Sequence, residues 1–157
     1  MKCLNSRLTP QFEMTASYDR AGLQFVYPES WTLADDTVDE VPRTISVQSP
    51  TGAFWSVDIH PFSVNAEQLL EDALAVMREE YPELESVKVT EEIDGDSAFG
   101  FNLDFYCLDF VVQCRLRALQ SGHATYLLTY QAEDRDFDEL ENVFKAITFS
   151  MFQETSV

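Results

Sequence analysis

The sequence predicts one α+β domain over residues 1–157, in which helices flank a mostly antiparallel β-sheet as an α/β/α sandwich. Apolar residues make up 45% of the chain and aromatic residues 13%, enough ring surface for one core, expected at about residues 12–150 between short frayed termini. Several segments alternate apolar and polar residues, as strands with one buried face do. Two other segments carry apolar residues at helical spacing, so the order is strands, helix, strands, helix.

The first part of the chain predicts two short strands and a loop. Residues 12–18 alternate between apolar and polar side chains and predict one strand. After a turn, residues 23–27 predict a second strand, which Pro28 ends. The segment 34–42 is rich in Asp and Glu, so we expect an exposed loop there.

The next part predicts a hairpin followed by a helix. Residues 44–49 and 54–59 read as paired strands, because Pro50-Thr51-Gly52 between them supplies a tight turn. Asn65 is a good helix cap, and Gln68 three residues later completes the pattern of a capping box. The helix ends before Pro82, and its apolar positions are Leu69, Leu70, Ala73, Met77 and Tyr81.

Four more strands are predicted in the second half of the chain. Their turn signals are Asp94-Gly95-Asp96 and Ser121-Gly122. The apolar face changes parity near Leu108, so we expect a tight turn or a bulge at Cys107-Leu108-Asp109. The four strands are residues 87–91, 98–106, 110–118 and 124–131.

A second helix closes the domain. Asp136 is a suitable N-terminal cap, and Glu139 stands at the third position after it. Acidic side chains around this helix start are favoured by the helix dipole, by about 0.3–1 kcal/mol each. The apolar stripe of the helix consists of Phe137, Leu140, Val143, Phe144 and Ile147.

The charge of the chain excludes two classes of partner. Lys and Arg number 10 and Asp and Glu 28, which gives a net charge of −18. This charge repels nucleic acid and anionic membranes, so neither is expected as a partner. No apolar run reaches the roughly 18 residues of a membrane span, and the first twelve residues lack the apolar region of a signal peptide.

The cysteines predict a reduced, cytoplasmic protein. Their number is odd and no CxxC pair is present, as in chains that stay reduced. Cys107 and Cys114 lie among aromatic and branched residues, so each is either a small core residue or one half of a redox pair across neighbouring strands.

Three stretches resemble the PsbP-like α/β/α sandwich family. One is the run from Leu23 to Trp31, an apolar strand followed by Pro28 and then by a Trp. Another is Ile93-Asp94-Gly95, which precedes small residues and a long strand. The third is 137–150, where an amphipathic helix runs into Ile147-Thr148-Phe149-Ser150.

The family includes the extrinsic PsbP subunit of photosystem II, a Ran-binding nuclear import factor and bacterial DcrB-like proteins. The resemblance covers about residues 18–149, and it implies a non-enzymatic protein that works by binding other proteins. Some bacterial relatives are chaperones for secreted effectors. No family motif fixes binding residues, so the resemblance implies none in this chain.

The sequence names no reaction. It has no nucleophile elbow, phosphate-binding loop, zinc-binding HExxH or dinucleotide fingerprint, so we expect a binding protein rather than an enzyme, without a cofactor. Asp58 and His60 share one strand face and are either a strand-end pair or a ligand and base. His123 is a hairpin residue. Glu91, Asp94 and Asp96 form either a solvated surface or a weak cation site.

Two sets of residues are candidates for binding a protein or a peptide, which the acidic surface predicts to be basic. Large rings are enriched at binding hot spots, but they also fill cores. The aromatic candidates are Trp31, Trp55 and Tyr27, and the acidic ones are Asp35, Asp36, Asp136 and Glu139.

Two other functions remain open from the sequence. One is a small-ligand carrier or small enzyme, in which Asp58, His60 and Cys114 converge on a pocket between sheet and helix. The other is a homodimer formed through exposed edge strands.

Overall fold

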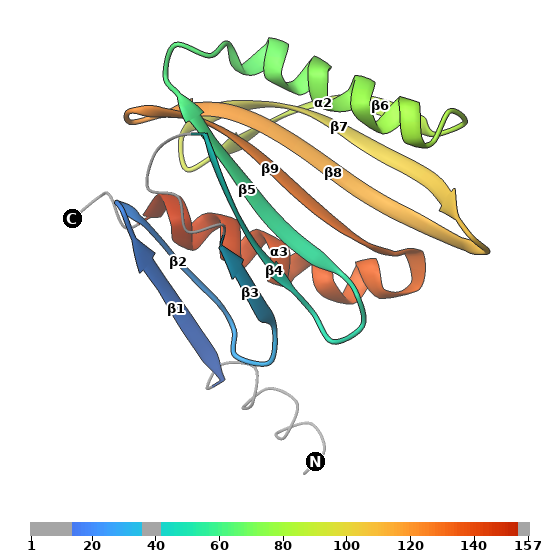
Figure 1. Cartoon of the computed structure of the whole chain (residues 1–157), viewed down its shortest axis with the longest axis horizontal. Coiled ribbons are helices and arrows are strands. Elements are labelled where there is room, and N and C mark those ends of the chain that lie inside the picture. The colour runs from blue at the N-terminus through green and yellow to red at the C-terminus, as the bar shows by residue number, and fades with distance from the viewer. Residues whose placement is uncertain (1–13, 36–41, 154–157) are drawn as a thin grey trace.

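The computed structural model describes residues 14–35 and 42–153 and confirms the α+β class. Seven strands form one sheet, and β1 and β2 form a separate hairpin (Figure 1). The elements are β1 (Thr15–Arg20), β2 (Leu23–Pro28), β3 (Thr32–Asp35), β4 (Arg43–Gln48), β5 (Phe54–Pro61), α2 (Ala66–Glu80), β6 (Glu85–Ile93), β7 (Asp96–Cys107), β8 (Phe110–Ser121), β9 (Ala124–Glu133) and α3 (Asp134–Gln153).

The sheet has the order β3-β4-β5-β9-β8-β7-β6, and every neighbouring pair is antiparallel. After β5 the chain leaves the sheet through α2 and returns at the far edge as β6, from which hairpins lead back to β9. The helix α2 packs on one face, mainly on β7, β8 and β9. The opposite face carries α3 and the β1–β2 hairpin (Figure 1).

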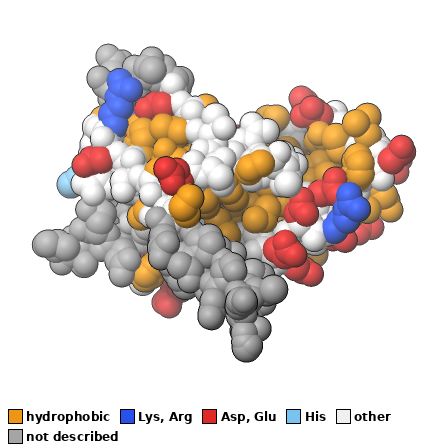
Figure 2. All heavy atoms as spheres, turned by 90° about the horizontal axis from the view of Figure 1, so that it is seen from below, with side chains coloured by type: hydrophobic (Ala, Val, Ile, Leu, Met, Phe, Trp, Pro, Cys, Tyr) orange, Lys and Arg blue, Asp and Glu red, His pale blue; other side chains and the backbone are white. Residues whose placement is uncertain are grey.

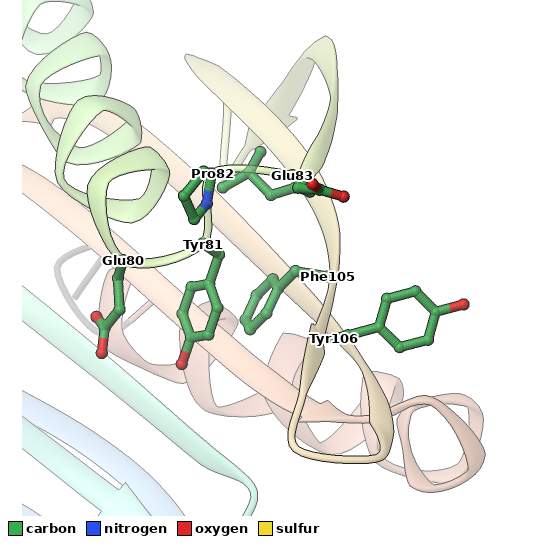
Figure 3. Close-up of a pocket in the computed structure, with 7 residues that line it drawn as sticks. Glu80, Tyr81, Pro82, Glu83, Phe105 and Tyr106 are labelled. Atoms are coloured by element: carbon green, nitrogen blue, oxygen red, sulfur yellow. The ribbon is translucent and has the colours of Figure 1, made fainter.

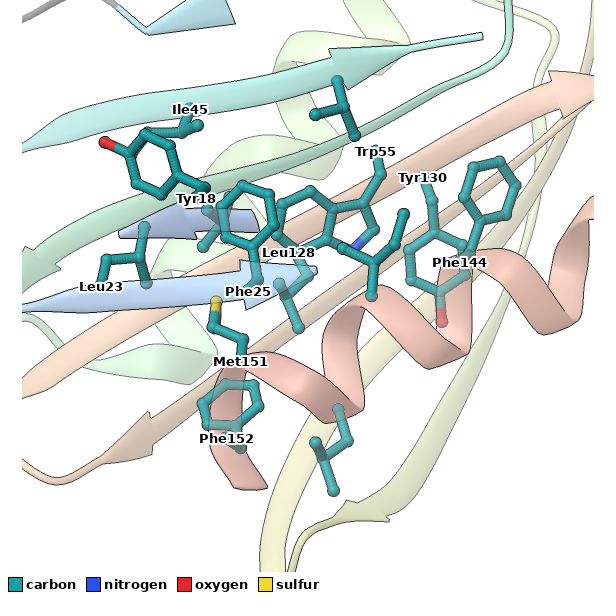
Figure 4. Packing of buried hydrophobic residues seen from close by; sticks show 14 of the residues in the cluster. Tyr18, Leu23, Phe25, Ile45, Trp55, Leu128, Tyr130, Phe144, Met151 and Phe152 are labelled. Atoms are coloured by element: carbon teal, nitrogen blue, oxygen red, sulfur yellow. The ribbon is translucent and has the colours of Figure 1, made fainter. Parts of the chain in front are cut away.

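The core on the α3 side is aromatic. Trp55 of β5 is fully buried, and its indole N–H donates to the Thr148 hydroxyl of α3 at 2.9 Å. The β1–β2 hairpin adds Phe25, whose ring lies 4.9 Å from that of Trp55 (Figure 4). Full burial stabilises a large apolar side chain by about 1.5–3 kcal/mol. We call this the α3-side core; its largest fully buried members include Trp55, Phe137, Phe144, Ile45, Leu128 and Ile147.

The core on the α2 side is mainly aliphatic. Leu70 and Leu74 of α2 pack on the strand face that carries Phe101, Leu103 and Phe105. Asn65 caps α2 as predicted, since its side-chain oxygen accepts from the Gln68 backbone N–H at 2.9 Å. The Gln68 side chain instead donates to Asp72, so only half of the capping box forms. This α2-side core also contains Cys114, Leu116 and Ala118.

The turns between the long strands follow the sequence. Asp94 and Gly95 both have positive φ, 50° and 89°, and close a two-residue hairpin between β6 and β7. The parity change near Leu108 is confirmed as a tight turn, because Cys107 pairs directly with Phe110.

Three sequence predictions are wrong at element boundaries. The first strand begins at Thr15, and Met14 is exposed; Phe12 lies outside the described residues. Asp35 is not in a loop but pairs with Ile45 of β4, a long-range contact that local composition does not reveal. The helix α3 starts at Asp134, directly after β9, which places Asp136 in its first turn rather than at its cap.

Candidate functional site

The β7–β8 hairpin ends in exposed apolar side chains. Its two strands have 12 residues each, more than the other strands described, and the turn extends past both helices (Figure 1). Tyr106 is 74% exposed and Leu108 89%, and Phe110 and Val111 are 46% and 36% exposed. We call these four residues the apolar tip. Figure 2 shows hydrophobic side chains gathered at this end of the molecule, with mainly acidic charged side chains around them.

The backbone at the apolar tip is strained. Leu108 has a φ of 58°, in the left-handed region where a Cβ clashes with the backbone. A non-glycine residue pays roughly 1–2 kcal/mol there, and Gly or Asn is the usual choice. Burial of the Leu108 side chain does not offset this conformational cost, because Leu108 is the most exposed of the large apolar residues described. Strain held by an exposed apolar residue indicates a role other than stability.

A cleft lies beside the apolar tip, between the C-terminal end of α2 and β7. It has a volume of about 290 Å³, and Tyr81 and Phe105 form its wall with their rings stacked 4.1 Å apart (Figure 3). The Tyr106 ring points away from that pair toward solvent. The remaining lining residues are Glu80, Pro82, Glu83 and Leu84.

Tyr81 carries the polar group of the aromatic cleft wall. Its hydroxyl lies 3.9 Å from the Cys107 Sγ and donates to it. Burial, and after it the hydrogen bond to Cys107, raises the pKa of Tyr81 above its usual value near 10. The phenol therefore stays neutral at physiological pH, so the cleft wall is an uncharged aromatic surface.

Acidic side chains border the apolar tip and the cleft. Glu80 and Glu83 lie on the cleft, Asp104 precedes Tyr106 by two residues on the same strand face, and Asp109 is in the turn. All four are exposed, and we call them the acidic rim. An apolar centre with a charged border is the usual anatomy of a protein-binding surface.

A buried polar cluster lies elsewhere in the sheet, and its groups bind one another. Arg117 is 5% exposed and donates to the Glu91 carboxylate, to the Asn102 side chain and to the carbonyls of Phe101 and Leu116. Gly100 opposite has no Cβ, which leaves room for the Arg117 side chain. Because its partners are internal, this cluster stabilises the sheet and presents no free cation.

The aromatic residues predicted from the sequence do not form a groove. Trp31 is 7% exposed and Trp55 is fully buried, so both belong to the α3-side core. The prediction that they line a binding groove at the surface is therefore wrong. Tyr27 is half-buried against Phe25, with ring centroids 5.8 Å apart. The physical reason is that α3 and the β1–β2 hairpin cover this face, which leaves the rings no solvent.

The predicted acidic residues are separate from the apolar tip. Asp35 accepts from the Tyr18 hydroxyl at 2.6 Å and pairs with Arg20 at 3.4 Å, so it has structural partners. Asp136 is half-buried and Glu139 exposed on the first turns of α3. Asp36 lies outside the described residues, as do Asp39, Glu40 and Cys3.

The groups that the ligand-carrier hypothesis needs do not converge. Asp58 accepts from Thr44 at 2.7 Å and lies opposite Leu127, whereas Cys114 lies opposite Gln131, four residues further along β9. Cys114 is fully buried, and burial raises the pKa of its thiol to about 12.

The redox and metal hypotheses find no support either. Cys107 pairs with Phe110 and Cys114 with Leu103, and both cysteines are free. Glu91 binds Arg117 and does not join Asp94 and Asp96. Among residues 14–35 and 42–153 no three His, Cys, Asp or Glu side chains lie close enough to hold a metal ion. Over the same residues, no helix is long and apolar enough to cross a membrane.

The apolar tip is the site that sequence reasoning missed. The signal was present, because every residue from Cys107 to Val112 except Asp109 is apolar and Leu108 replaces the expected Gly or Asn. The parity change located the turn, but it carried no information about exposure.

Comparison with known proteins shows the fold. The chain has the PsbP-like fold, and three solved structures that align with it are given below. Cyanobacterial PsbP (CyanoP) from Synechocystis sp. PCC 6803 aligns with a TM-score of 0.64 at 12% identity, over 87% of this chain and 91% of that one. PA94 from Pseudomonas aeruginosa, of unknown function, aligns at 0.50 and 11% identity, over 87% and 94%. A Bacteroides thetaiotaomicron VPI-5482 protein aligns at 0.52 and 13% identity, over 83% and 46%.

Sequence comparison adds nothing to this likeness. No family model matches the chain, and no curated protein sequence matches it. At identities of 11–13% the structural likeness shows the fold alone.

Proposed function

We propose that the protein is a non-catalytic module that binds a protein or peptide through the apolar tip and the acidic rim. The observation that carries the proposal is the exposure of Tyr106 and Leu108, 74% and 89%, at the end of the β7–β8 hairpin, which extends past both helices that the structure describes. Large apolar side chains that are buried on binding supply most of the energy of an interface, roughly 25 cal/mol for each Å² removed from water.

The chemistry of the partner follows from the two parts of the surface. The apolar tip and the cleft wall of Tyr81 and Phe105 suit an aliphatic or aromatic anchor. The acidic rim, in a chain with net charge −18, suits Lys or Arg beside that anchor. The expected partner is therefore a basic segment with one or two large apolar residues.

A displayed library of random peptides tests this proposal on the full chain. Peptides that combine Lys or Arg with aromatic or aliphatic residues are expected to be enriched, and to bind more weakly as salt rises from about 0.05 to 0.5 M. A variant with Tyr106→Thr and Leu108→Asn keeps strand and turn propensity and should lose at least about tenfold in affinity.

Val76→Ser is the matched control, because Val76 is also an exposed apolar residue, 63% exposed, but lies on α2. The control should bind as the native chain does. Equal retention of the peptides by the tip variant and the native chain would contradict the proposal, as would selection of acidic peptides.

A second function has one observation in its favour. A hollow of about 460 Å³ lies between β6 and α3, lined by Ile93, Tyr130, Lys145 and Phe149 among others, and could hold a small molecule. A thermal-shift screen with metabolites separates the two functions. A shift of several degrees by one compound, lost in Lys145→Ala, would favour the small-ligand carrier.

We also propose a cytoplasmic location, supported by the free thiols of Cys107 and Cys114, since reducing compartments keep cysteines unpaired. Mass spectrometry of thiols alkylated in intact cells tests it. Cys107 should be recovered fully reduced, and its recovery in a disulfide would contradict the location.

A further inference from the structure

Among the strands that the structure describes, β6 forms one edge of the sheet. Its nine residues, Glu85–Ile93, pair with β7 on one side, and β6 is the last strand of the sheet order on the other. The helices pack mainly on strands further in, α2 on β7 to β9 and α3 on β2, β8 and β9. A strand added beside β6 therefore meets neither helix over most of its length.

The free hydrogen-bonding groups of β6 belong to its even-numbered residues. The two-residue turn at Asp94 and Gly95 closes on Ile93 and Asp96, which form a hydrogen-bonded pair. Every second residue of β6 before Ile93 then points its N–H and C=O toward β7. The outward groups are those of Ser86, Lys88, Thr90 and Glu92, and all but Ser86 are exposed residues.

We infer that a second copy of this chain pairs with β6, antiparallel, about a two-fold axis that passes beside Thr90. Such an axis is perpendicular to the sheet, so the same face of both copies points in the same direction. Even-numbered residues of one copy then lie opposite even-numbered residues of the other, and odd-numbered opposite odd-numbered. In this register Lys88 lies opposite Glu92 of the second copy, and the two-fold symmetry forms the same pair again with the copies exchanged. Val87 and Ile93 likewise form two such pairs.

Neighbouring registers are less favourable. With Lys88 on the axis, two ammonium groups face each other and Glu85 opposes Glu91. With Glu91 on the axis, two carboxylates face each other. With Val89 on the axis, Lys88 meets Thr90 and makes no charge pair. Like charges that lie directly opposite destabilise a strand pair, and opposite charges stabilise it, so the Thr90 register is the self-complementary one.

The Thr90 register also covers exposed apolar surface. Val87 is 61% exposed and Phe149 of α3 is 48% exposed. Ile93 and Phe149 line the hollow between β6 and α3, and this hollow opens on the face that carries Val87. Val87 of the second copy, opposite Ile93, is thus placed at the mouth of the hollow. A continuous sheet across two copies buries these side chains and satisfies the edge groups of both.

Charge reversal tests the pairing, with molar mass measured by light scattering and by sedimentation across a concentration series. The native chain should form a dimer. Lys88→Glu and Glu92→Lys alone each create two like-charge pairs and should weaken the dimer about tenfold or more. The double variant restores both pairs and should recover native dimerisation, with the native net charge.

Two matched controls exclude a general effect of charge. Arg135→Glu on α3 and Glu71→Lys on α2 make the same charge changes at exposed helix positions away from β6, and should dimerise as the native chain does. Circular dichroism melts show whether each variant folds. A native chain that stays monomeric at about 0.5 M salt, where the repulsion between copies is screened, overturns the inference. So does a double variant no better than its parents.

A cysteine scan tests the register and separates β6 from the apolar tip. Thr90→Cys should cross-link to itself under mild oxidation, since Cα atoms in a hydrogen-bonded pair lie about 5.5 Å apart, within disulfide range. Stronger cross-linking of Val89→Cys or Lys88→Cys overturns the register. Leu108→Asn should leave the dimer intact; its loss would place self-association at the tip instead of β6.

Discussion

The α3-side core and the apolar tip hold the same kinds of side chain in opposite surroundings. Trp55 of β5 and Phe144 of α3 are fully buried where α3 packs on the sheet, whereas Tyr106 and Phe110, on strands of the same sheet, face solvent. The difference lies in what covers each place: a helix and a hairpin cover the core, and the β7–β8 turn extends past both helices. Exposed rings at the tip therefore contribute little to folding, and their value lies in contact with another molecule.

The largest expected effect tests the covered side of this comparison. Trp55→Ala should lower the free energy of unfolding by about 3–5 kcal/mol, because it empties a closed part of the core and leaves the Thr148 hydroxyl without its donor. Urea unfolding followed by circular dichroism measures the change.

Tyr106→Ala is the counterpart of Trp55→Ala at the apolar tip and should cost no more than about 0.5 kcal/mol. Trp55→Phe keeps most of the ring and loses the N–H, so it should fall between the two. Similar losses for Trp55→Ala and Tyr106→Ala would show that the tip is part of the folding core.

The next effect compares the middle of β7 with its end. Gly100→Ala places a methyl group 2.8 Å from the Leu116 carbonyl oxygen and 2.7 Å from Arg117 atoms, which Glu91 and Asn102 hold in place. We expect a loss of about 1–3 kcal/mol, since backbone contacts cannot yield as a flexible side chain does.

Ser97→Ala, on an exposed position of the same strand, is the control for Gly100→Ala and should change stability by less than about 0.5 kcal/mol. Chemical denaturation of the two variants gives the comparison. A native-like Gly100→Ala would mean that Arg117 moves aside freely and that the cluster is not rigid.

The sequence predicts the core better than it predicts the surface. The α2 boundaries follow from Asn65 and from apolar spacing, both local signals. Whether Trp55 lines a groove or fills a core depends on Thr148, 93 residues away, and on α3 packing over it. The strand β3 was missed because Asp35 and the acidic residues that follow it predict a loop, and only its pairing with β4 makes it a strand.

The candidate site was out of reach for a related reason. The turn at Leu108 was visible in the parity of the strands, but its exposure depends on where α2 ends, at Glu80, relative to a hairpin that continues beyond it. The lengths of the strands and of the helix follow from local sequence signals. How far the hairpin extends beyond the end of the helix is set by how the two pack together. A leucine in place of Gly or Asn at a turn was the one local sign of function.

The next effect is smaller, and it comes from a substitution at Leu108 that should raise stability but weaken binding. Leu108→Gly removes the strain of a φ of 58° and should raise the free energy of unfolding by up to about 1 kcal/mol, while it weakens peptide binding at the apolar tip. Thermal and urea unfolding measure the first change, and binding of a selected peptide measures the second.

Ala21→Gly is the matched control for Leu108→Gly, because Ala21 has a φ of 52° in the β1–β2 turn. It should gain similar stability and keep full binding. A Leu108→Gly chain that is less stable than native would mean that Leu108 makes a contact needed for folding.

The last effect is confined to alkaline pH and compares two tyrosines. Burial raises the pKa of Tyr130 to about 12, while its unfolded value is near 10. Between about pH 10 and 12 the unfolded chain therefore holds fewer protons than the folded one, and the stability that the neutral phenol contributes below pH 10 is lost as pH rises. One such group accounts for at most about 1.4 kcal/mol per pH unit.

Tyr130→Phe isolates this contribution among the other tyrosines. Its melting temperature should fall less steeply than that of the native chain from pH 9 to pH 11, whereas Tyr106→Phe at the exposed tip should follow the native curve. Parallel curves for native and Tyr130→Phe would show that water reaches the Tyr130 hydroxyl in the folded state. The α3-side core would then be open to water at the hollow between β6 and α3. The core and the apolar tip would differ only in how much solvent reaches them.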